Sequence, residues 1–150
     1  MATTVFDKPV GTEIGQLSSL TTSNKTSLVN AINSLNSNFT LSGVAITMES
    51  GVTSNIFAHK HSDSNPVVTI NGYVTFTNAP TSQVHFATIA QGARPGSPVR
   101  ILCGLAPYAY DPPSAIGYLN IATDGKMYIN PPTNNTSKNA YFSVSYYAQG

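Results

Sequence analysis

The residues best suited to recognition chemistry lie close together in the sequence. One proline-rich stretch carries Tyr108, Tyr110 and Asp111, and Arg94 and Tyr118 flank it. Tyrosine rings stack on the C–H faces of sugars, while carboxylate and guanidinium groups hydrogen-bond to hydroxyls in the plane of the sugar ring. If Tyr108 and Tyr110 lie on a strand, they share one face, which makes a saccharide-binding platform possible. The alternative is that both are core or interface aromatics.

Support for catalysis is weaker. The sequence contains neither Gly-x-Ser-x-Gly nor His-Glu-x-x-His, two common signatures of hydrolases. Glycoside hydrolysis needs two carboxylates that flank one bond, and the acids available are Asp7, Glu13, Glu49, Asp63, Asp111 and Asp124. We therefore expect a protein that is not an enzyme and uses no cofactor. Two acids that meet across a subunit boundary would leave polysaccharide cleavage as an alternative.

His59 and His61 form the only pattern that resembles a metal site. Residues spaced i and i+2 on a strand point to the same face. We favour the plain interpretation of two exposed histidines beside the turn at 62–66, because the pair has no further ligands nearby in sequence. His85 alternates with apolar neighbours, which favours an outward or intersubunit polar side chain over a ligand.

Charged residues are scarce in this chain. Only 9% of the 150 residues are charged, and 14 Asn, 17 Ser and 17 Thr supply polarity instead. Seven Lys and Arg against six Asp and Glu give no basic surface for nucleic acid and no electrostatic patch for a membrane. No stretch approaches the ~18 apolar residues of a membrane span. The first ten residues lack the features of a signal peptide. The one cysteine, Cys103, is expected to be a small buried hydrophobe.

From Leu41 onward the sequence is typical of a mostly β domain. Val, Ile, Thr, Tyr and Phe dominate between Gly, Pro and Asn punctuation, which predicts an antiparallel β-sandwich or jelly-roll-like head. Asp124-Gly125 predicts a two-residue type I′ turn, and Asn71-Gly72 fits a tight turn or a bulge within one long strand. We expect strands near 43–49, 53–58, 66–77, 84–90, 98–104, 116–123, 126–130 and 140–148. Loops that are either binding surfaces or ordinary connections are expected at 90–98, 107–115 and 130–139.

Ahead of the β region, residues 22–39 predict one helix. Leu28, Ile32, Leu35 and Phe39 recur at spacings of four, three and four, which places a narrow apolar seam on one face. Such a seam usually needs copies of itself, so we expect this helix to join an oligomer. Ile at a and Leu at d favour dimers, but two heptads do not fix the number of chains. The alternative is that the helix folds back on its own sheet.

The run IGQLSSLTTSNKTSLVNAINSLN, residues 14–36, resembles the helical connector of phage tail-fibre and baseplate proteins, which precedes a receptor-binding or interaction domain. Arg94-Pro95 and the later run LNIATDGKMYI are similar to a pattern in the small β heads of such proteins. The chain lacks Trp, so a sugar platform built from Trp is not implied. The resemblance implies a homotrimer. In a trimer, three His59/His61 pairs would place six imidazoles around the axis, as trimeric phage spikes do for iron.

Residues and resemblance together predict a phage tail-tip or baseplate component. Segment 1–40 would be an extended lead and trimerisation helix, and 41–150 the β head. The head is expected to bind a host cell-surface saccharide in the virion, after synthesis in the bacterial cytoplasm, with other tail proteins as further partners. One alternative is a purely structural tail component that docks another tail protein. A less favoured one is a polysaccharide-cleaving enzyme.

Overall fold

The computed structural model describes residues 29–30, 32–33, 41–61 and 66–149. The chain divides into two units, Met1–Thr40 and Leu41–Gly150. In the first unit the described residues are helical, and Val29 and Ile32 are largely exposed. The other residues of the predicted seam lie outside the described ranges, so the seam stays a prediction: Leu28, Leu35 and Phe39. Within the described ranges no helix combines the length and apolar character that a membrane crossing requires.

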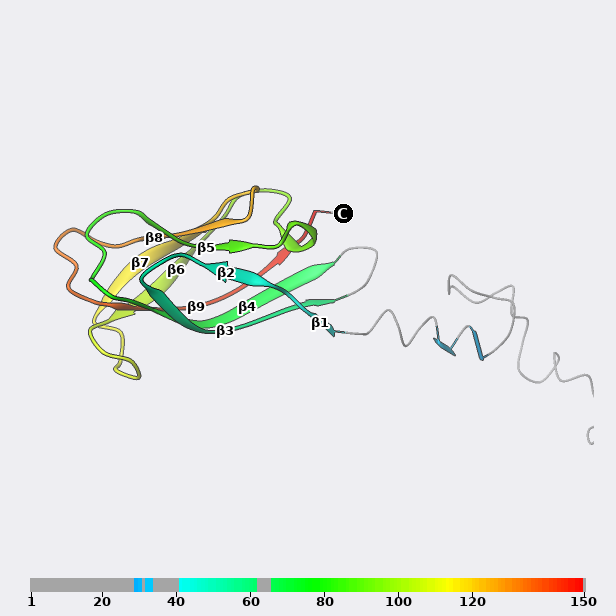
Figure 1. Cartoon of the computed structure of the whole chain (residues 1–150), viewed down its shortest axis with the longest axis horizontal. Helices are drawn as coiled ribbons and strands as arrows, with labels where there is room; N and C mark the ends of the chain where they lie inside the picture. The colour runs from blue at the N-terminus through cyan, green and yellow to red at the C-terminus, as the bar shows by residue number, and fades with distance from the viewer. Residues whose placement is uncertain (1–28, 31, 34–40, 62–65, 150) are drawn as a thin grey trace, which may run out of the picture. The chain divides into compact units, whose positions relative to one another are not determined.

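In the described part of the second unit, the head, nine strands form one antiparallel sheet (Figure 1). Neighbouring strands follow the order β1-β3-β4-β9-β6-β7-β8-β5-β2. The head is therefore mostly β, as its alternating sequence predicts. The strands are β1 (Leu41–Gly43), β2 (Ile46–Met48), β3 (Val52–His61), β4 (Val67–Phe76), β5 (Val84–Ile89), β6 (Val99–Ala106), β7 (Ala115–Ile121), β8 (Lys126–Asn130) and β9 (Asn139–Tyr147).

This sheet curls so that its halves face each other as the walls of a half-barrel (Figure 1). One wall contains β3, β4 and β9, and the other contains β6, β7, β8 and β5. The walls join where β9 pairs with β6 over only three residue pairs, from Gly104↔Tyr141 to Ala106↔Asn139. The two layers that the sequence predicts as a sandwich or jelly roll thus belong to a single continuous sheet.

The segment expected to be one strand at 43–49 is divided between the two walls. β1 pairs with β3, whereas β2 pairs with β5. Between them, the Val44 amide donates to the Ala58 carbonyl at 3.0 Å, and the Ala45 carbonyl accepts from the Ala90 amide at 3.0 Å. This crossing connects the two edges of the sheet and explains the break in the predicted strand.

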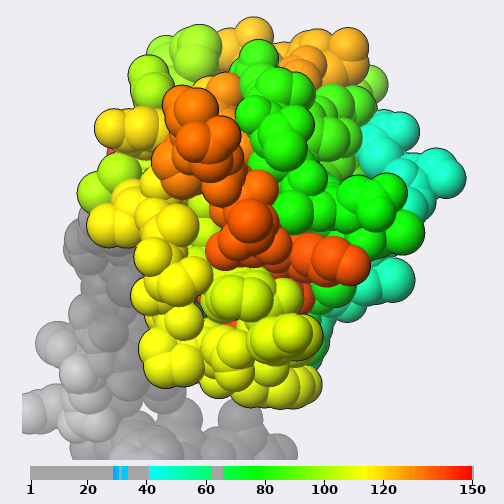
Figure 2. All heavy atoms as spheres, turned by 90° about the vertical axis from the view of Figure 1, so that its left-hand side faces the viewer, coloured from blue at the N-terminus to red at the C-terminus, as the bar shows by residue number. Residues whose placement is uncertain are grey.

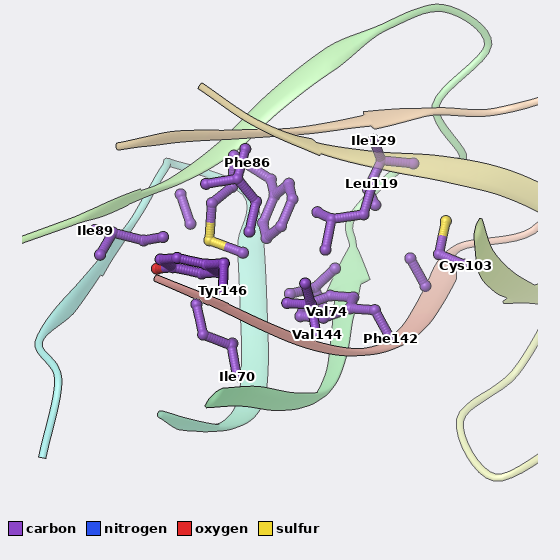
Figure 3. Close-up of a cluster of buried hydrophobic side chains, with 14 of the residues drawn as sticks. Ile70, Val74, Phe86, Ile89, Cys103, Leu119, Ile129, Phe142, Val144 and Tyr146 are labelled. Carbon is purple, nitrogen blue, oxygen red and sulfur yellow. The ribbon is translucent and has the colours of Figure 1, made fainter. Parts of the chain in front are cut away.

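Inward-facing side chains from both walls fill the space between them (Figure 3). The Phe86 ring of β5 lies 6.2 Å from the Phe76 ring of β4 and 6.0 Å from the Phe142 ring of β9, measured between ring centroids. Phe86 therefore links the two walls directly. Cys103 is buried and free, as expected, and burial raises the pKa of its thiol to about 11, so the thiol is protonated at neutral pH.

The structure differs from two local predictions. Gly72 lies inside β4 with φ +136°, and the register to both neighbouring strands runs through it without a shift. The site is neither a turn nor a bulge, and a Cβ there would collide with the Asn55 carbonyl oxygen. At the Asp124-Gly125 turn only Gly125 has a positive φ, and its amide donates to the Ala122 carbonyl at 2.9 Å. A type I′ turn needs two positive φ values, so this is instead the pattern of a turn closed by a glycine bulge.

The head has two ends that differ in their connections (Figure 1). The β1 end contains Leu41 and the loops at 90–98 and 122–125. The opposite end, here called the loop end, contains the loops at 77–83, 107–114 and 131–138. The candidate recognition residues divide between these ends and the outer faces of the sheet.

Candidate functional site

Three of the five predicted recognition residues lie together at the loop end, viewed directly in Figure 2, where the 107–114 loop is yellow and the 131–138 loop is orange. The side chains of Tyr108 and Tyr110 are 72% and 82% exposed, and Asp111 is exposed beside them. All three follow β6, which ends at Ala106. The two tyrosines therefore lie in a loop, as the proline-rich segment predicts, and the condition for a shared strand face is not met. Within this chain they are not core residues.

A cluster of three tyrosines fixes this loop to the sheet. Tyr73 on β4 and Tyr141 on β9 are cross-strand neighbours with ring centroids 5.3 Å apart. The Tyr110 amide donates to the Tyr141 hydroxyl at 2.7 Å, and the Tyr73 and Tyr110 hydroxyls share a hydrogen bond of 3.2 Å. This shared hydrogen bond, followed by the proximity of the Tyr73 phenol, raises the pKa of Tyr110.

The cluster holds Tyr110 in an unusual backbone conformation. Its φ is +70°, a left-handed value that a non-glycine residue rarely adopts without compensating contacts. The hydrogen bond to Tyr141 and the edge-to-face contact with Tyr73, at 5.8 Å between ring centroids, provide those contacts. The 107–114 loop thus has a defined shape, which a rigid binding surface requires.

Beside the cluster is an open pocket of about 390 Å³. Its walls combine an aromatic ring, a proline, two threonine side chains, an amide and one lysine. The lining residues are Thr75, Pro107, Tyr108, Ala109, Thr136, Lys138 and Asn139. A concave surface with apolar walls and a few convergent polar groups is the common form of a small-ligand site.

Buried amides organise the backbone around this pocket. Asn139 accepts a hydrogen bond from the Thr75 hydroxyl at 2.6 Å, and its amide group donates to the carbonyls of Ala106 at 3.3 Å and Pro107 at 3.2 Å. Asn135 donates to the Pro80 carbonyl at 2.9 Å. The three loops of this end are therefore joined by satisfied buried groups. Such networks rigidify their surroundings.

Arg94 lies apart from this site, contrary to the sequence prediction. It is at the β1 end, where its Nε donates to the Ile89 carbonyl at 3.2 Å and its own carbonyl accepts from the Gln149 amide at 2.8 Å. Tyr118 is also separate, on the outer face of β7, with the Arg100 guanidinium 4.1 Å from its ring centroid. Neither residue contributes to the pocket.

Sequence reasoning missed Tyr73, Tyr141, Thr75, Asn139 and Lys138. Nothing in the sequence marked these five residues as functional, because each lies in a segment whose pattern is explained by an ordinary strand or loop. Tyr141 alternates with the buried Phe142 along β9, but nothing in the sequence places Tyr73 opposite it. Strand pairing between β4 and β9 supplies that proximity.

His59 and His61 lie on the exposed outer face of β3, as the i, i+2 spacing predicts. Among the residues described, no group of three or more His, Cys, Asp or Glu side chains could hold a metal ion. His85 is half-buried, with Nδ1 3.4 Å from Glu49 Oε1 and Nε2 3.0 Å from the Ala87 carbonyl. These contacts give His85 a local structural role on β5.

The described carboxylates occupy different surroundings. Glu49 faces His85, and Asp111 lies in the 107–114 loop. Asp124 accepts a hydrogen bond from the Lys126 amide at 3.0 Å and faces the Lys126 amine at 3.6 Å. The Lys126 amide hydrogen bond is the main reason that the pKa of Asp124 is lowered. The absence of catalysis stays a prediction.

Comparisons with known proteins yield a likeness in structure. No family model matches the sequence, and no curated protein matches it. The fold is similar to the crystal structure of the receptor binding protein (gp15) of Listeria phage PSA, with a TM-score of 0.65 and 13% sequence identity. The match covers 82% of this chain and 74% of that chain. At this identity the likeness shows the fold: the chain shares the β architecture of a phage receptor-binding protein.

Proposed function

We propose that this chain is a receptor-binding component of a phage tail tip or baseplate, and that its head binds a host cell-surface saccharide without catalysis. The observation that carries the proposal is the exposed Tyr108 ring beside a rigid, amide-braced pocket at the loop end. The fold likeness to a phage receptor-binding protein supports the setting. In this proposal the protein resides in the virion, with other tail proteins as partners.

The chemistry of the pocket suits a sugar ring. Tyr108 offers an aromatic face for stacking on C–H groups. The Thr75 hydroxyl donates its proton to Asn139, so its oxygen is free to accept a hydrogen bond from a sugar hydroxyl. The pocket is open to solvent, which fits weak binding at each site. Copies within an oligomer would raise the overall affinity by avidity.

The experiment is binding of the purified full-length protein to intact cells and to isolated wall polysaccharide from a panel of bacterial strains. We expect strain-selective binding that soluble polysaccharide competes. Tyr108→Ala should lower the affinity by about tenfold or more, as expected for an aromatic anchor. Tyr147→Ala is the matched control, because Tyr147 is 70% exposed on β9, outside the residues that line the pocket. Equal losses in both variants, or no binding by the folded protein, would contradict the proposal.

The helix of the first unit is proposed to join three chains. Ile32 is helical and exposed in this chain, which leaves it available to a partner helix. Replacing Ile32 and Leu35 with Gln should lower the oligomer mass measured by light scattering, while Asn33→Gln, off the seam, should not. An unchanged mass would show that the head alone holds the assembly. A wild-type monomer at micromolar concentration, with its helix intact, would refute the homotrimer.

One observation favours the structural alternative, in which the head docks a neighbouring tail protein. Leu102 on β6 and Ile116 on β7 are largely exposed on the outer face of one wall, and Tyr118 is partly exposed beside them. Exposed apolar residues that gather on one face often mark a protein contact. This alternative predicts that no polysaccharide in the panel binds, and that substitution of Leu102 or Ile116 blocks assembly into tails.

A further inference from the structure

Of the described residues that line the loop-end pocket, Lys138 alone is charged. It is exposed and forms no ion pair or side-chain hydrogen bond with the residues that the structure describes. The other described cations each have a partner. Lys60 donates to the Gly92 carbonyl, Arg94 to the Ile89 carbonyl, Arg100 covers the Tyr118 ring, and Lys126 faces Asp124.

The backbone holds Lys138 firmly in place. Its carbonyl accepts from the Phe76 amide at 2.8 Å, and its two neighbours in sequence, Ser137 and Asn139, are both buried. The Ser137 amide donates to Asn135 Oδ1 at 3.1 Å. Because both flanking residues point inward, the Lys138 side chain projects outward at the pocket rim. The backbone from which this cation extends is therefore fixed before any ligand binds, so that only the side chain has to be ordered on binding.

A free ammonium beside partly apolar walls attracts an anion more strongly than one surrounded by water. The pocket adds to it the Thr75 oxygen, which can accept from a sugar hydroxyl, and the Tyr108 ring, which can stack on the sugar. Asp111 lies in the neighbouring loop but does not line the pocket. The lining residues that the structure describes therefore include a cation and no carboxylate.

From this arrangement we propose that the saccharide bound at the loop end carries an anionic group, phosphate or carboxylate, and that Lys138 binds that group. The inference rests on the proposed function and specifies its ligand class. The shared chemistry is a negatively charged oxygen attached to a sugar whose ring stacks on Tyr108. Charge-assisted hydrogen bonds of this kind are among the stronger polar contacts.

The experiment uses the full-length protein and wall polysaccharide from a strain that binds it. The polysaccharide is tested untreated, after removal of phosphate with hydrofluoric acid, and after reduction of carboxylates with carbodiimide and borohydride. We expect one of the two treatments to weaken wild-type binding by about tenfold, the effect of losing one charged hydrogen bond. The effective treatment identifies the group as phosphate or carboxylate.

Variants connect that loss to one side chain. Lys138→Ala should bind untreated polysaccharide about tenfold more weakly and should show little further loss after the effective treatment. Its affinity should also depend less on salt concentration than the wild-type affinity does. Lys138→Arg should keep most of the affinity. Lys126→Ala is the control, because this exposed lysine faces Asp124 at the turn after β7 and does not line the pocket.

The outcomes separate the two proposals. If Lys138→Ala binds like wild type and neither treatment weakens binding, while Tyr108→Ala still loses affinity, the anionic ligand is refuted and saccharide binding stands. If a treatment weakens wild type and Lys138→Ala equally, the anion is not bound by Lys138, and the inference fails. If no untreated polysaccharide binds, both proposals fail.

Discussion

The two ends of the head use similar residue types in opposite ways. At the β1 end, Arg94 donates to the Ile89 carbonyl, Lys60 donates to the Gly92 carbonyl at 2.6 Å, and the buried Tyr146 hydroxyl donates to the Ala93 carbonyl at 2.8 Å. At the loop end, Tyr108 is exposed and Lys138 has no partner among the described residues. Exposed tyrosines occur at both ends, because Tyr147 beside the 90–98 loop is also exposed. Of the described lysines and arginines, however, Lys138 at the loop end is the one left without a partner.

The reason lies in how each end satisfies its carbonyl groups. Residues 89–93 turn across one opening of the half-barrel, and their carbonyls take donors from long side chains. At the loop end the Ala106 and Pro107 carbonyls take their donor from Asn139, which is buried beneath the loop. Because the short, buried Asn139 side chain supplies this donor, the longer side chains of that end are not needed for it and remain exposed. A residue type alone therefore does not identify a site.

The largest effect is expected where both ends depend on the same core. Phe86→Ala removes the ring that contacts Phe76 and Phe142, and should lower the free energy of unfolding by about 3–5 kcal/mol. Urea unfolding followed by circular dichroism measures this. Phe57→Ala is the control, because Phe57 is 59% exposed on β3, and it should change stability by less than about 0.5 kcal/mol. If the structure of one end were lost at a lower urea concentration than that of the other, the two ends would unfold independently.

Next in size is the amide that organises the loop end. Asn139→Ala leaves the Ala106 and Pro107 carbonyls without their side-chain donor and should destabilise the head by about 1–3 kcal/mol. It should also weaken polysaccharide binding, because the pocket wall at Pro107 loses its anchor. Asn71→Ala, an exposed change on β4, should alter neither property. Full binding by Asn139→Ala at a temperature where it is folded would contradict the bracing role.

A smaller effect is expected at the β1 end. Arg94→Ala removes the donor to the Ile89 carbonyl and should lower stability by about 1 kcal/mol, while binding to cells and polysaccharide stays unchanged. Measuring both quantities on one preparation tests the contrast between the ends directly. Reduced binding by folded Arg94→Ala would restore Arg94 to the recognition site and remove that contrast.

The smallest effect concerns pH at the Asp124 turn. The Lys126 amide hydrogen bond lowers the pKa of Asp124 in the folded state, so the charged carboxylate stabilises the fold. This contribution is complete above the unfolded pKa of about 4 and is lost as the pH falls through the lower folded pKa. The urea midpoint of Asp124→Asn should therefore lie slightly below that of wild type at pH 6, with the difference shrinking towards pH 2. A constant difference across that range would contradict the assignment.

Much of the fold could be predicted from the sequence, because inward and outward residues alternate with a period of two. Seven of the eight expected strands correspond to single observed strands, with their ends displaced by a few residues. The exception, 43–49, failed because no local signal says that β1 and β2 join opposite walls. The predicted type of the Asp124-Gly125 turn was wrong because Asp-Gly fits more than one hairpin geometry.

The candidate site was predicted in part. Tyr108, Tyr110 and Asp111 are adjacent in sequence and stay together in the fold. Arg94 and Tyr118 were grouped with them by sequence distance alone, and the direction of the strands separates them. β6 carries the chain from the β1 end to the loop end, so Arg94 and Tyr108 lie before and after the same strand, at opposite ends.

By itself, the sequence determined the mostly β character of the head, the buried alternating positions and the proline-rich loop at 107–115, because these depend on local patterns of side-chain polarity and on proline. Only the tertiary structure decided that one curled sheet forms both walls, that Tyr73 and Tyr141 brace Tyr110, and that Lys138 borders the pocket. These features depend on which strands pair and in what register. Such pairings join residues 30 to 80 positions apart, and no local pattern specifies contacts at that separation.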